Sequence, residues 1–180
     1  MKLKTLLKES NDIHWKKSSL EGAPEEVGDF YCADNQLTSL EGAPKKVDGY
    51  FYCGHNKLTS LEGAPKKVGL DFNCHDNKLT SLEGAPKEVG GYFDCNLNKL
   101  TSLKNIHKIV NAIKGKFSCH NNPIKSHVLG LLLIKGINGI RLDNNVVENI
   151  LNKHLGEGKA GVIDAQRELE DAGLDEYAQL

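Results

Sequence analysis

The sequence has no long hydrophobic run and almost no net charge. Its longest apolar stretch, Leu131 to Ile134, is far shorter than the roughly 20 residues that cross a bilayer. The start, MKLKTLLKES, lacks the apolar core of a secretory signal. Lysine and arginine number 23 and aspartate and glutamate 24, so no overall field attracts nucleic acid or an anionic membrane. We therefore expect a soluble, cytoplasmic, single-domain protein that chooses its partners by local surface chemistry.

Much of the chain is an internal repeat. The segment SLEGAP occurs four times and leads each time, through a valine, to the pattern F-x-C-x-x-N-x-L. The repeated cysteines are 21 residues apart, at Cys32, Cys53, Cys74 and Cys95, and Cys119 follows after three extra residues. The asparagines come three positions after the cysteines, at Asn35, Asn56, Asn77, Asn98 and Asn122. A weaker sixth unit lies at 140–147.

The repeat predicts one short strand per coil. Period-two alternation sends Phe51 and Cys53 inward and Tyr50, Tyr52 and Gly54 outward. The asparagine that follows can hydrogen-bond to backbone groups of neighbouring coils. We predict an α/β repeat protein, a leucine-rich-repeat solenoid with a parallel sheet, a 21-residue period and a carboxy-terminal helical cap.

The ends of the chain differ from the repeats. We expect an amino-terminal cap over 1–17, the solenoid over 18–147 and a helical cap over 148–180, forming one structural unit. The apolar residues of the first cap are Leu3, Leu6, Leu7, Ile13 and Trp15. We expect a first helix after Ser126. A capping box formed by Asn145 and Glu148 predicts a second helix that ends at Gly156. A third helix is expected between Val162 and Gly173.

The five cysteines could be metal ligands, disulfides or core residues. They lack the close paired spacing of a zinc motif, and an odd number in a cytoplasmic chain argues against disulfides. All five occupy one repeat position, which favours a buried column. We therefore expect no metal and no cofactor.

The outward strand positions are where the repeats stop repeating. Tyrosine there offers a large contact area at low entropic cost, although it also simply favours strands. We predict a partner-binding face made of Tyr31, Tyr50, Tyr52, Asp71, Asn73, His75, Tyr92, Asp94, Asn96, His120 and Arg141. His75 and His120 are two coils apart, about 9–10 Å at the usual strand spacing, which is too far to share one ion. No nucleophile or phosphate motif is present, so we do not expect an enzyme.

Two functions remain open. A protein-binding module is the first, and a small-ligand or nucleotide sponge using the tyrosines, histidines and Arg141 is the second. A basic strip at Lys45, Lys46, Lys66, Lys67 and Lys87 could contact phosphates, but glutamates bound it and no nucleic-acid-binding motif accompanies it. Nucleic acid is therefore an unlikely partner, and we expect no membrane contact.

From Ser18 to Ile124 the chain resembles the short leucine-rich-repeat proteins encoded by tailed bacteriophages, whose units have nearly the same LTSLEGAPKKVGG-F-x-C-x-x-N pattern. The closing segment GVIDAQRELEDAGLDEYAQL resembles the helical tail that follows such repeats. The resemblance implies a solenoid, a phage context and hence the host cytoplasm. It also implies that the protein partner is a host or defence factor that the chain inhibits.

Overall fold

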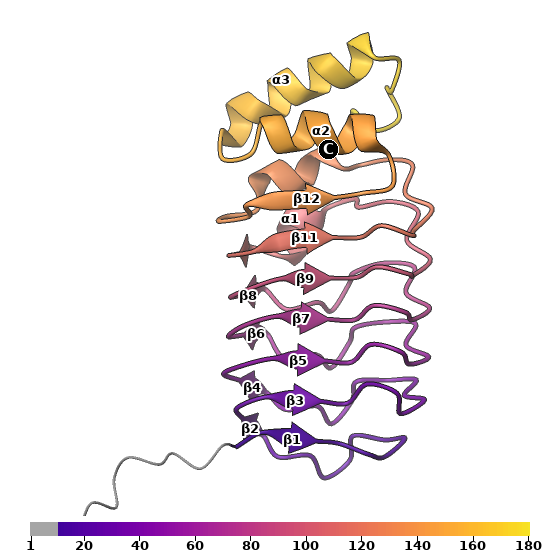
Figure 1. The fold of residues 1–180 in the computed structure, drawn as a ribbon, viewed down its shortest axis with the longest axis vertical. Coiled ribbons are helices and arrows are strands. Elements are labelled where there is room, and N and C mark those ends of the chain that lie inside the picture. The colour runs from indigo at the N-terminus through magenta and orange to yellow at the C-terminus, as the bar shows by residue number, and fades with distance from the viewer. Residues whose placement is uncertain (1–10) are drawn as a thin grey trace, which may run out of the picture.

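The computed structural model describes residues 11–180, which form a solenoid of parallel strands followed by helices (Figure 1). One sheet has seven strands in the order β1-β3-β5-β7-β9-β11-β12, each parallel to its neighbours. Its strands are Ile13–His14 (β1), Phe30–Tyr31 (β3), Phe51–Tyr52 (β5), Phe72–Asn73 (β7), Phe93–Asp94 (β9), Lys116–Ser118 (β11) and Gly139–Arg141 (β12). The predicted repeat solenoid, its parallel sheet and its helical end are confirmed.

A second sheet lies on the opposite side of the coils and was not predicted. It has five strands in the order β10-β8-β6-β4-β2. They are Glu26–Val27 (β2), Lys46–Val47 (β4), Lys67–Val68 (β6), Glu88–Val89 (β8) and Ala112–Ile113 (β10). In each strand the first residue is more exposed than the second, an apolar residue that is buried. Each repeating coil therefore presents an apolar side chain to the core from both sides.

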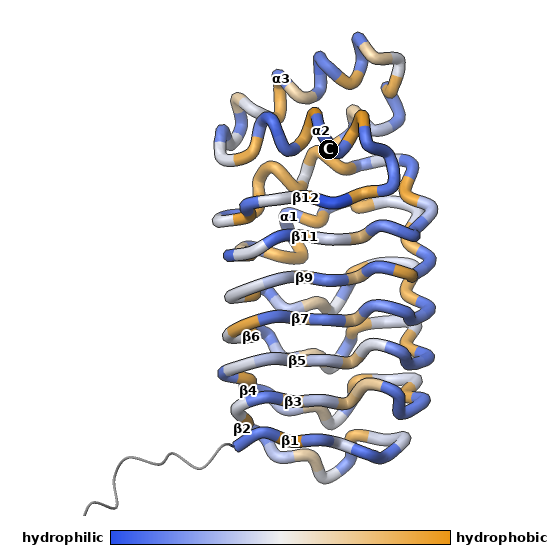
Figure 2. Tube along the Cα trace, viewed as in Figure 1, coloured by the Kyte–Doolittle hydropathy of each residue, from blue (hydrophilic) through white to orange (hydrophobic). Residues whose placement is uncertain are grey.

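The core between the sheets is built from stacked columns of identical residues. The rings of Phe30, Phe51, Phe72, Phe93 and Phe117 have no solvent exposure. Neighbouring ring centroids lie 5.6, 5.7, 5.1 and 5.4 Å apart, distances at which aromatic pairs attract each other beyond simple burial. The five cysteines are also buried and form no disulfide, which confirms the predicted column. Figure 2 shows the hydrophobic residues recurring at the same places from coil to coil.

The asparagines join successive coils through their side-chain amides. In Asn77, Nδ2 donates to the carbonyls of Cys53 and Cys74 at 3.1 Å each, and Oδ1 accepts from the Leu58 N–H at 2.9 Å. Asn56, Asn98 and Asn122 repeat this arrangement. Each amide thus bonds its own coil to the preceding one, as the sequence predicted.

The helical end differs in detail from its prediction. Residues 129–133 form a 3₁₀ helix (Leu129–Leu133, η1) without a side-chain cap, so the expected cap at Ser126 is wrong. Helix α2 (Asn145–Lys153) is capped by Asn144, whose Oδ1 accepts from two backbone N–H groups. The predicted capping box is therefore wrong: the carboxylate of Glu148 instead accepts from the Leu142 N–H at 2.8 Å, which ties the helix to the last coil.

Two further helices complete the structure. Helix α1 (Ile106–Ile109) is a single turn that packs near η1. Helix α3 (Gly158–Asp171) confirms the last predicted helix and lies against η1 and α2. The described residues contain no helix with the length and apolar character needed to cross a membrane.

His154 links α2 to α3 as a buried charged residue. Its Nδ1 lies 2.9 Å from Glu157 Oε2 and its Nε2 lies 3.0 Å from Glu168 Oε1. Because both ring nitrogens face carboxylates, both must donate, and the ring is then an imidazolium. The hydrogen bond to Glu157, reinforced by Glu168 and opposed by burial, raises the pKa of His154.

The amino-terminal residues add a strand rather than only a cap. Strand β1 pairs with β3, placing Ile13 opposite Phe30 and His14 opposite Tyr31. The Trp15 ring packs 6.1 Å from the Phe30 ring and closes the aromatic column. Ile13 and Trp15 are partly buried against the core, as predicted, whereas the predicted contributions of Leu3, Leu6 and Leu7 lie outside the described residues.

Candidate binding face

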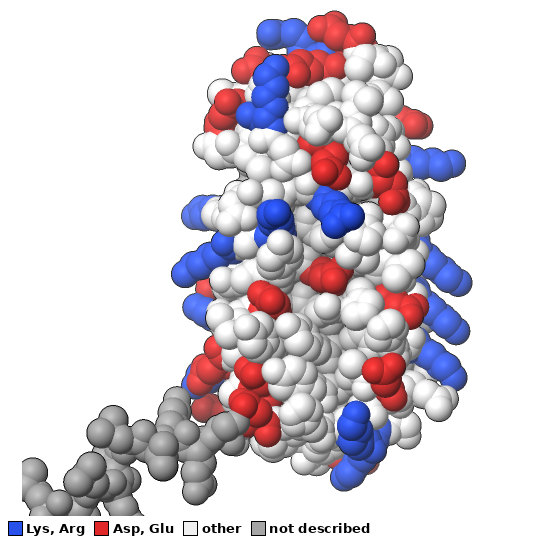
Figure 3. All heavy atoms as spheres, in the orientation of Figure 1, with Lys and Arg blue, Asp and Glu red and all other residues white. Residues whose placement is uncertain are grey.

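The outward side chains of the seven-stranded sheet form one surface, which we call the strand face. The strand register places Tyr52 between Tyr31 and Asn73, and Asp94 between Asn73 and Ser118. Figure 3 views this surface directly: many lysines and arginines project along the two edges of the solenoid, and the face between them carries several acidic groups and a few basic ones. Five predicted site residues therefore lie in one row across the sheet, namely Tyr31, Tyr52, Asn73, Asp94 and Arg141. The other six lie within two residues of these strands or of β11, at Tyr50, Asp71, His75, Tyr92, Asn96 and His120.

Aromatic rings cluster at the amino-terminal half of the strand face. His14 stacks on Tyr31 with ring centroids 4.7 Å apart, Tyr31 meets Tyr52 at 5.3 Å, and Tyr50 meets Tyr52 at 5.4 Å. His14 was missed because its strand was assigned to a cap. Burial, followed by a hydrogen bond to Asp29, raises the pKa of Tyr31 to about 12. Burial also raises the pKa of Tyr52.

The tyrosine hydroxyls differ in what they contact. That of Tyr31 donates to Asp29 Oδ2 at 2.9 Å. Those of Tyr50, Tyr52 and Tyr92 have no hydrogen-bond partner within residues 11–180. Tyr92 is also 45% exposed. These three hydroxyls remain available to bind a ligand or a partner.

Asp71 supports the sheet more than it faces outward. Its Oδ1 accepts from the Tyr92 N–H at 2.7 Å, and Asp29 accepts in the same way from the Tyr50 N–H at 2.8 Å. A Cβ on Gly91 would lie only 2.1 Å from Asp71 Oδ1, so a glycine is required for the carboxylate to reach the next coil. Asp71 therefore has a structural role in addition to its predicted contact role.

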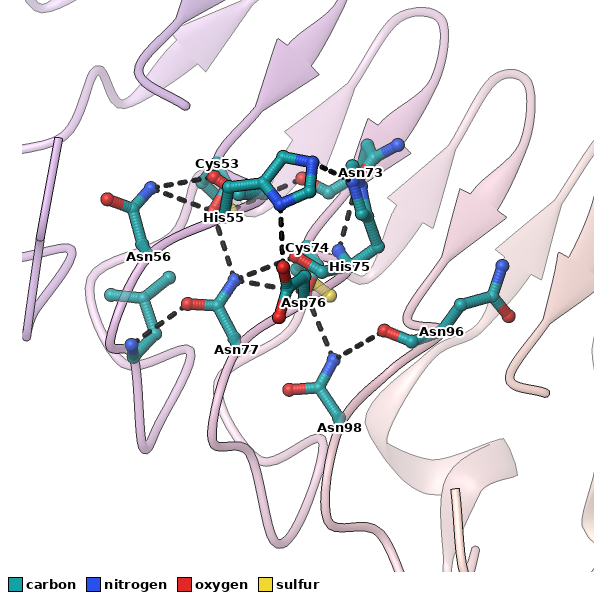
Figure 4. A network of polar contacts seen from close by, with 12 residues as sticks. Cys53, His55, Asn56, Asn73, Cys74, His75, Asp76, Asn77, Asn96 and Asn98 are labelled. Carbon is teal, nitrogen blue, oxygen red and sulfur yellow. Dashed lines mark hydrogen bonds and ion pairs between the residues drawn. The ribbon is translucent and has the colours of Figure 1, made fainter. Parts of the chain in front are cut away.

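A chain of polar contacts crosses the centre of the strand face, and Figure 4 shows three of its members, His75, Asn73 and Asn96. His75 Nδ1 contacts Asn73 Oδ1, and Asn73 Nδ2 donates to Asp94 Oδ2 at 3.3 Å. Asp94 Oδ1 accepts from the Asn96 N–H at 3.0 Å. Ser118 then donates to Asn96 Oδ1 at 3.0 Å. The structure therefore brings the predicted residues His75, Asn73, Asp94 and Asn96 together.

His55, which was not predicted as a site residue, extends this chain of contacts. His55 follows its strand with φ of 50°, and this left-handed conformation brings its ring beside His75. The Nε2 atoms of the two rings are 2.9 Å apart, and His55 Nδ1 lies 2.7 Å from Asp76 Oδ2. Gly54, predicted to point outward, is buried, and a Cβ there would lie 2.7 Å from the His75 ring. The glycine leaves the space that the ring occupies.

The carboxy-terminal part of the face is hollowed and carries charges of both signs. A depression of about 390 Å³ is lined by Tyr92, Lys116, Ser118, Asn138, Gly139, Ile140, Arg141, Glu148 and Asn152. Lys116 and Arg141 form no ion pair with any described residue. His120 lies beside a neighbouring hollow and contacts Asn121 at 3.0 Å. Two cations and an exposed tyrosine could contact an anionic or aromatic group here.

The buried thiols are poorly suited to nucleophilic chemistry. Burial raises the pKa of Cys32 to about 12 and those of Cys53, Cys74 and Cys95 well above the ordinary value. Since the thiolate is the reactive form, these cysteines serve packing. In residues 11–180, one group of three potential metal ligands has its ligating atoms within 4.8 Å, namely His154, Glu157 and Asp164. The hydrogen bonds of His154 to two carboxylates make that group a structural junction.

The basic strip is largely neutralised by neighbouring coils. Lys45 pairs with Glu25 at 2.6 Å, Lys67 with Glu88 at 2.9 Å, and Lys46 with Glu26 and Asp48 at 3.4 Å each. Such exposed pairs contribute little stability, but they place an anion beside these cations.

Comparison with protein-family models, with curated proteins and with solved structures finds no match for the chain.

Proposed function

We propose that the chain is a non-enzymatic module of the leucine-rich-repeat type that binds a protein through its strand face. The observation that supports this most is the ring cluster of His14, Tyr31, Tyr50 and Tyr52 on a rigid stack of coils. Stacking holds these rings in place before a partner arrives, so little conformational freedom is lost on binding. Tyrosine is also enriched among the residues that dominate interface energies.

The polar centre of the face complements these rings. Asn73, Asp94 and Asn96 are half-buried and hold one another through hydrogen bonds, so they present fixed donors and acceptors next to aromatic area. Interfaces commonly combine apolar anchors with such polar groups. The resemblance to phage-encoded repeat proteins supports a narrower version, in which the partner is a host or defence factor that the chain inhibits.

The hollow at the carboxy-terminal end favours a second function. Lys116 and Arg141 beside Tyr92 could hold the phosphate and base of a nucleotide, which would make the chain a small-ligand sponge. Such a ligand would not depend on Tyr52, which lies three strands from Ser118 in the sheet order. Both functions involve Tyr92, so Tyr52 and Arg141 are the residues that distinguish them.

The test begins with a pull-down from bacterial lysate, followed by affinity measurements with the partner that is retained. Tyr52→Ala and Tyr92→Ala should each weaken binding by about 1 kcal/mol or more. Lys66→Ala is the matched control, because Lys66 is exposed outside the strand face and its side chain has no partner among the described residues. Melting curves of all three variants establish that the fold is intact.

The outcomes separate the two functions. Loss of binding in both tyrosine variants supports the protein-binding face. The ligand sponge is supported if the chain retains no protein partner but carries a small molecule in native mass spectrometry, and if Arg141→Ala no longer carries that molecule. If Lys66→Ala abolishes binding while both tyrosine variants bind normally, the strand face is not the site.

A further inference from the structure

His55 and His75 have hydrogen-bond requirements that their own side chains do not satisfy. Nδ1 of His55 faces the Asp76 carboxylate at 2.7 Å, and a carboxylate only accepts. This nitrogen must therefore carry a hydrogen and donate a hydrogen bond. In a neutral His55, Nε2 then has an unprotonated lone pair. Asp76 thus determines that the His55 nitrogen facing His75 is the unprotonated one.

The same reasoning applies to His75. Its Nδ1 contacts Asn73 Oδ1, and the orientation of that amide is fixed from two sides. Asn73 Oδ1 also accepts from the His75 backbone N–H at 3.0 Å, and Nδ2 donates to Asp94 at 3.3 Å. Rotating the amide would place its oxygen against the Asp94 carboxylate. Nδ1 of His75 is therefore the protonated nitrogen, and its Nε2 has an unprotonated lone pair as well.

Two lone pairs consequently face each other across 2.9 Å. This arrangement requires a cation between or beside the nitrogens, either an extra proton or a metal ion. We propose that Nε2 of His55 and Nε2 of His75 bind a divalent transition-metal ion such as Zn²⁺ on the strand face.

The surroundings of the two rings fit a metal ion. Histidines that ligate metals almost always donate their other N–H to a carboxylate or carbonyl oxygen, which orients the ring and strengthens the ligand, and Asp76 and Asn73 provide these acceptors. The rings are nearly perpendicular, at 83°, with centroids 4.3 Å apart. Their nitrogens therefore approach at an angle rather than head-on, as two ligands of one ion do.

The distances are compatible with a shared ion. Zinc–nitrogen bonds of about 2.0–2.1 Å at a tetrahedral angle separate two nitrogens by about 3.3 Å, so the present 2.9 Å has to open by only a few tenths of an ångström. The His55 side chain is 46% exposed, which allows entry of the ion and leaves its remaining positions for water. The positive φ of His55 and the absence of a side chain at Gly54 allow the two histidine rings to lie this close together.

The test is calorimetric titration of the chelator-treated full chain with Zn²⁺. Wild type should bind one ion per chain at this site, and His55→Gln and His75→Gln should each weaken that binding by at least tenfold. Asp76→Asn should weaken it by about 10–100-fold, because a second-shell carboxylate is lost. His120→Gln is the matched control, since His120 lies on the same face but makes its contact to Asn121, and it should bind like wild type.

Two results would overturn the proposal. One is Zn²⁺ binding that is unchanged in both His55→Gln and His75→Gln. The other is a wild-type chain that does not bind Zn²⁺, with imidazole ¹⁵N spectra showing a proton shared by the pair. Melting curves of each variant identify any loss of affinity that arises from unfolding, and in that case His55→Ala and Asp76→Asn, both changes at exposed positions, decide the outcome.

Discussion

Replacing Asn77 by alanine tests the asparagine ladder at its centre. The three carbonyls that its Nδ2 contacts each keep another partner: Cys53 O bonds to Asn56, Cys74 O to Asn98, and His75 O to the His55 N–H. Only the Leu58 N–H, which donates to Asn77 Oδ1, is left without an acceptor. An unsatisfied buried N–H costs about 1–3 kcal/mol and the lost donated bonds about 1 kcal/mol more, so we expect a total of about 2–4 kcal/mol.

Asn77→Asp sharpens the test because the shape is almost unchanged. One oxygen can still accept from Leu58, but the other faces the carbonyl oxygens that Nδ2 contacted. At about pH 7 this uncompensated buried charge should cost about 3–5 kcal/mol. Burial raises the pKa of the introduced carboxyl in the folded state above its unfolded value. The penalty is therefore complete above the raised folded pKa and is relieved as the pH falls through that value.

Urea unfolding at about pH 7 and about pH 5 measures both effects. Asn111→Ala is the control, because Asn111 is exposed and its side chain has no partner in the described part of the chain. If Asn77→Ala stays within about 0.5 kcal/mol of that control, a change typical of neutral surface sites, the ladder does not stabilise the fold. The same conclusion follows if Asn77→Asp is as stable as wild type at about pH 7.

Three further predictions concern the core and the helical end. Phe72→Ala should cost about 3–5 kcal/mol and lower Tm far more than Asn73→Ala, and equal effects in melting curves would mean that the strand faces are assigned the wrong way round. The five cysteines should react slowly with a thiol reagent in the native protein and fully in denaturant, and rapid native labelling would contradict the buried column. The stabilisation that His154 provides relative to His154→Gln should be fully present below the ordinary histidine pKa. It should be lost as the pH rises through the raised pKa of the folded state. A difference in unfolding free energy that does not vary with pH would refute the imidazolium junction.

Repetition explains how much of this fold the sequence could predict. Phenylalanine and cysteine recur in five units with the alternation of a strand, as at Phe51 and Cys53. Asparagine recurs three positions after the cysteine, as at Asn56, which suits hydrogen bonding to the backbone of neighbouring coils. The second sheet escaped prediction because a two-residue strand such as Lys46–Val47 is too short to show alternation. At the helical end, Glu148 satisfied the capping pattern, but a tertiary partner, the Leu142 N–H, took its carboxylate.

The candidate site was predicted only in part for a related reason. Period-two alternation locates the residues on strands, so Tyr52 and Asn73 were found. His55 comes after its strand, and a left-handed backbone turns its side chain back over the face. That conformation, and the space above Gly54 that receives the His75 ring, depend on contacts between coils. The local sequence pattern alone does not encode them.

Coil-to-coil pairing at a fixed offset makes the chain's length adjustable in whole units. Phe51 pairs with Phe72 and Phe72 with Phe93, each 21 residues later. Deleting residues 54–74 would join Cys53 directly to His75 and recreate the same contacts one coil closer. Duplication or loss of such a unit would change the reach of the strand face by about 4.8 Å at a time, while each remaining coil kept the neighbours it needs. A lineage of such proteins could match partners of different size by gene-segment copying, without redesigning a core.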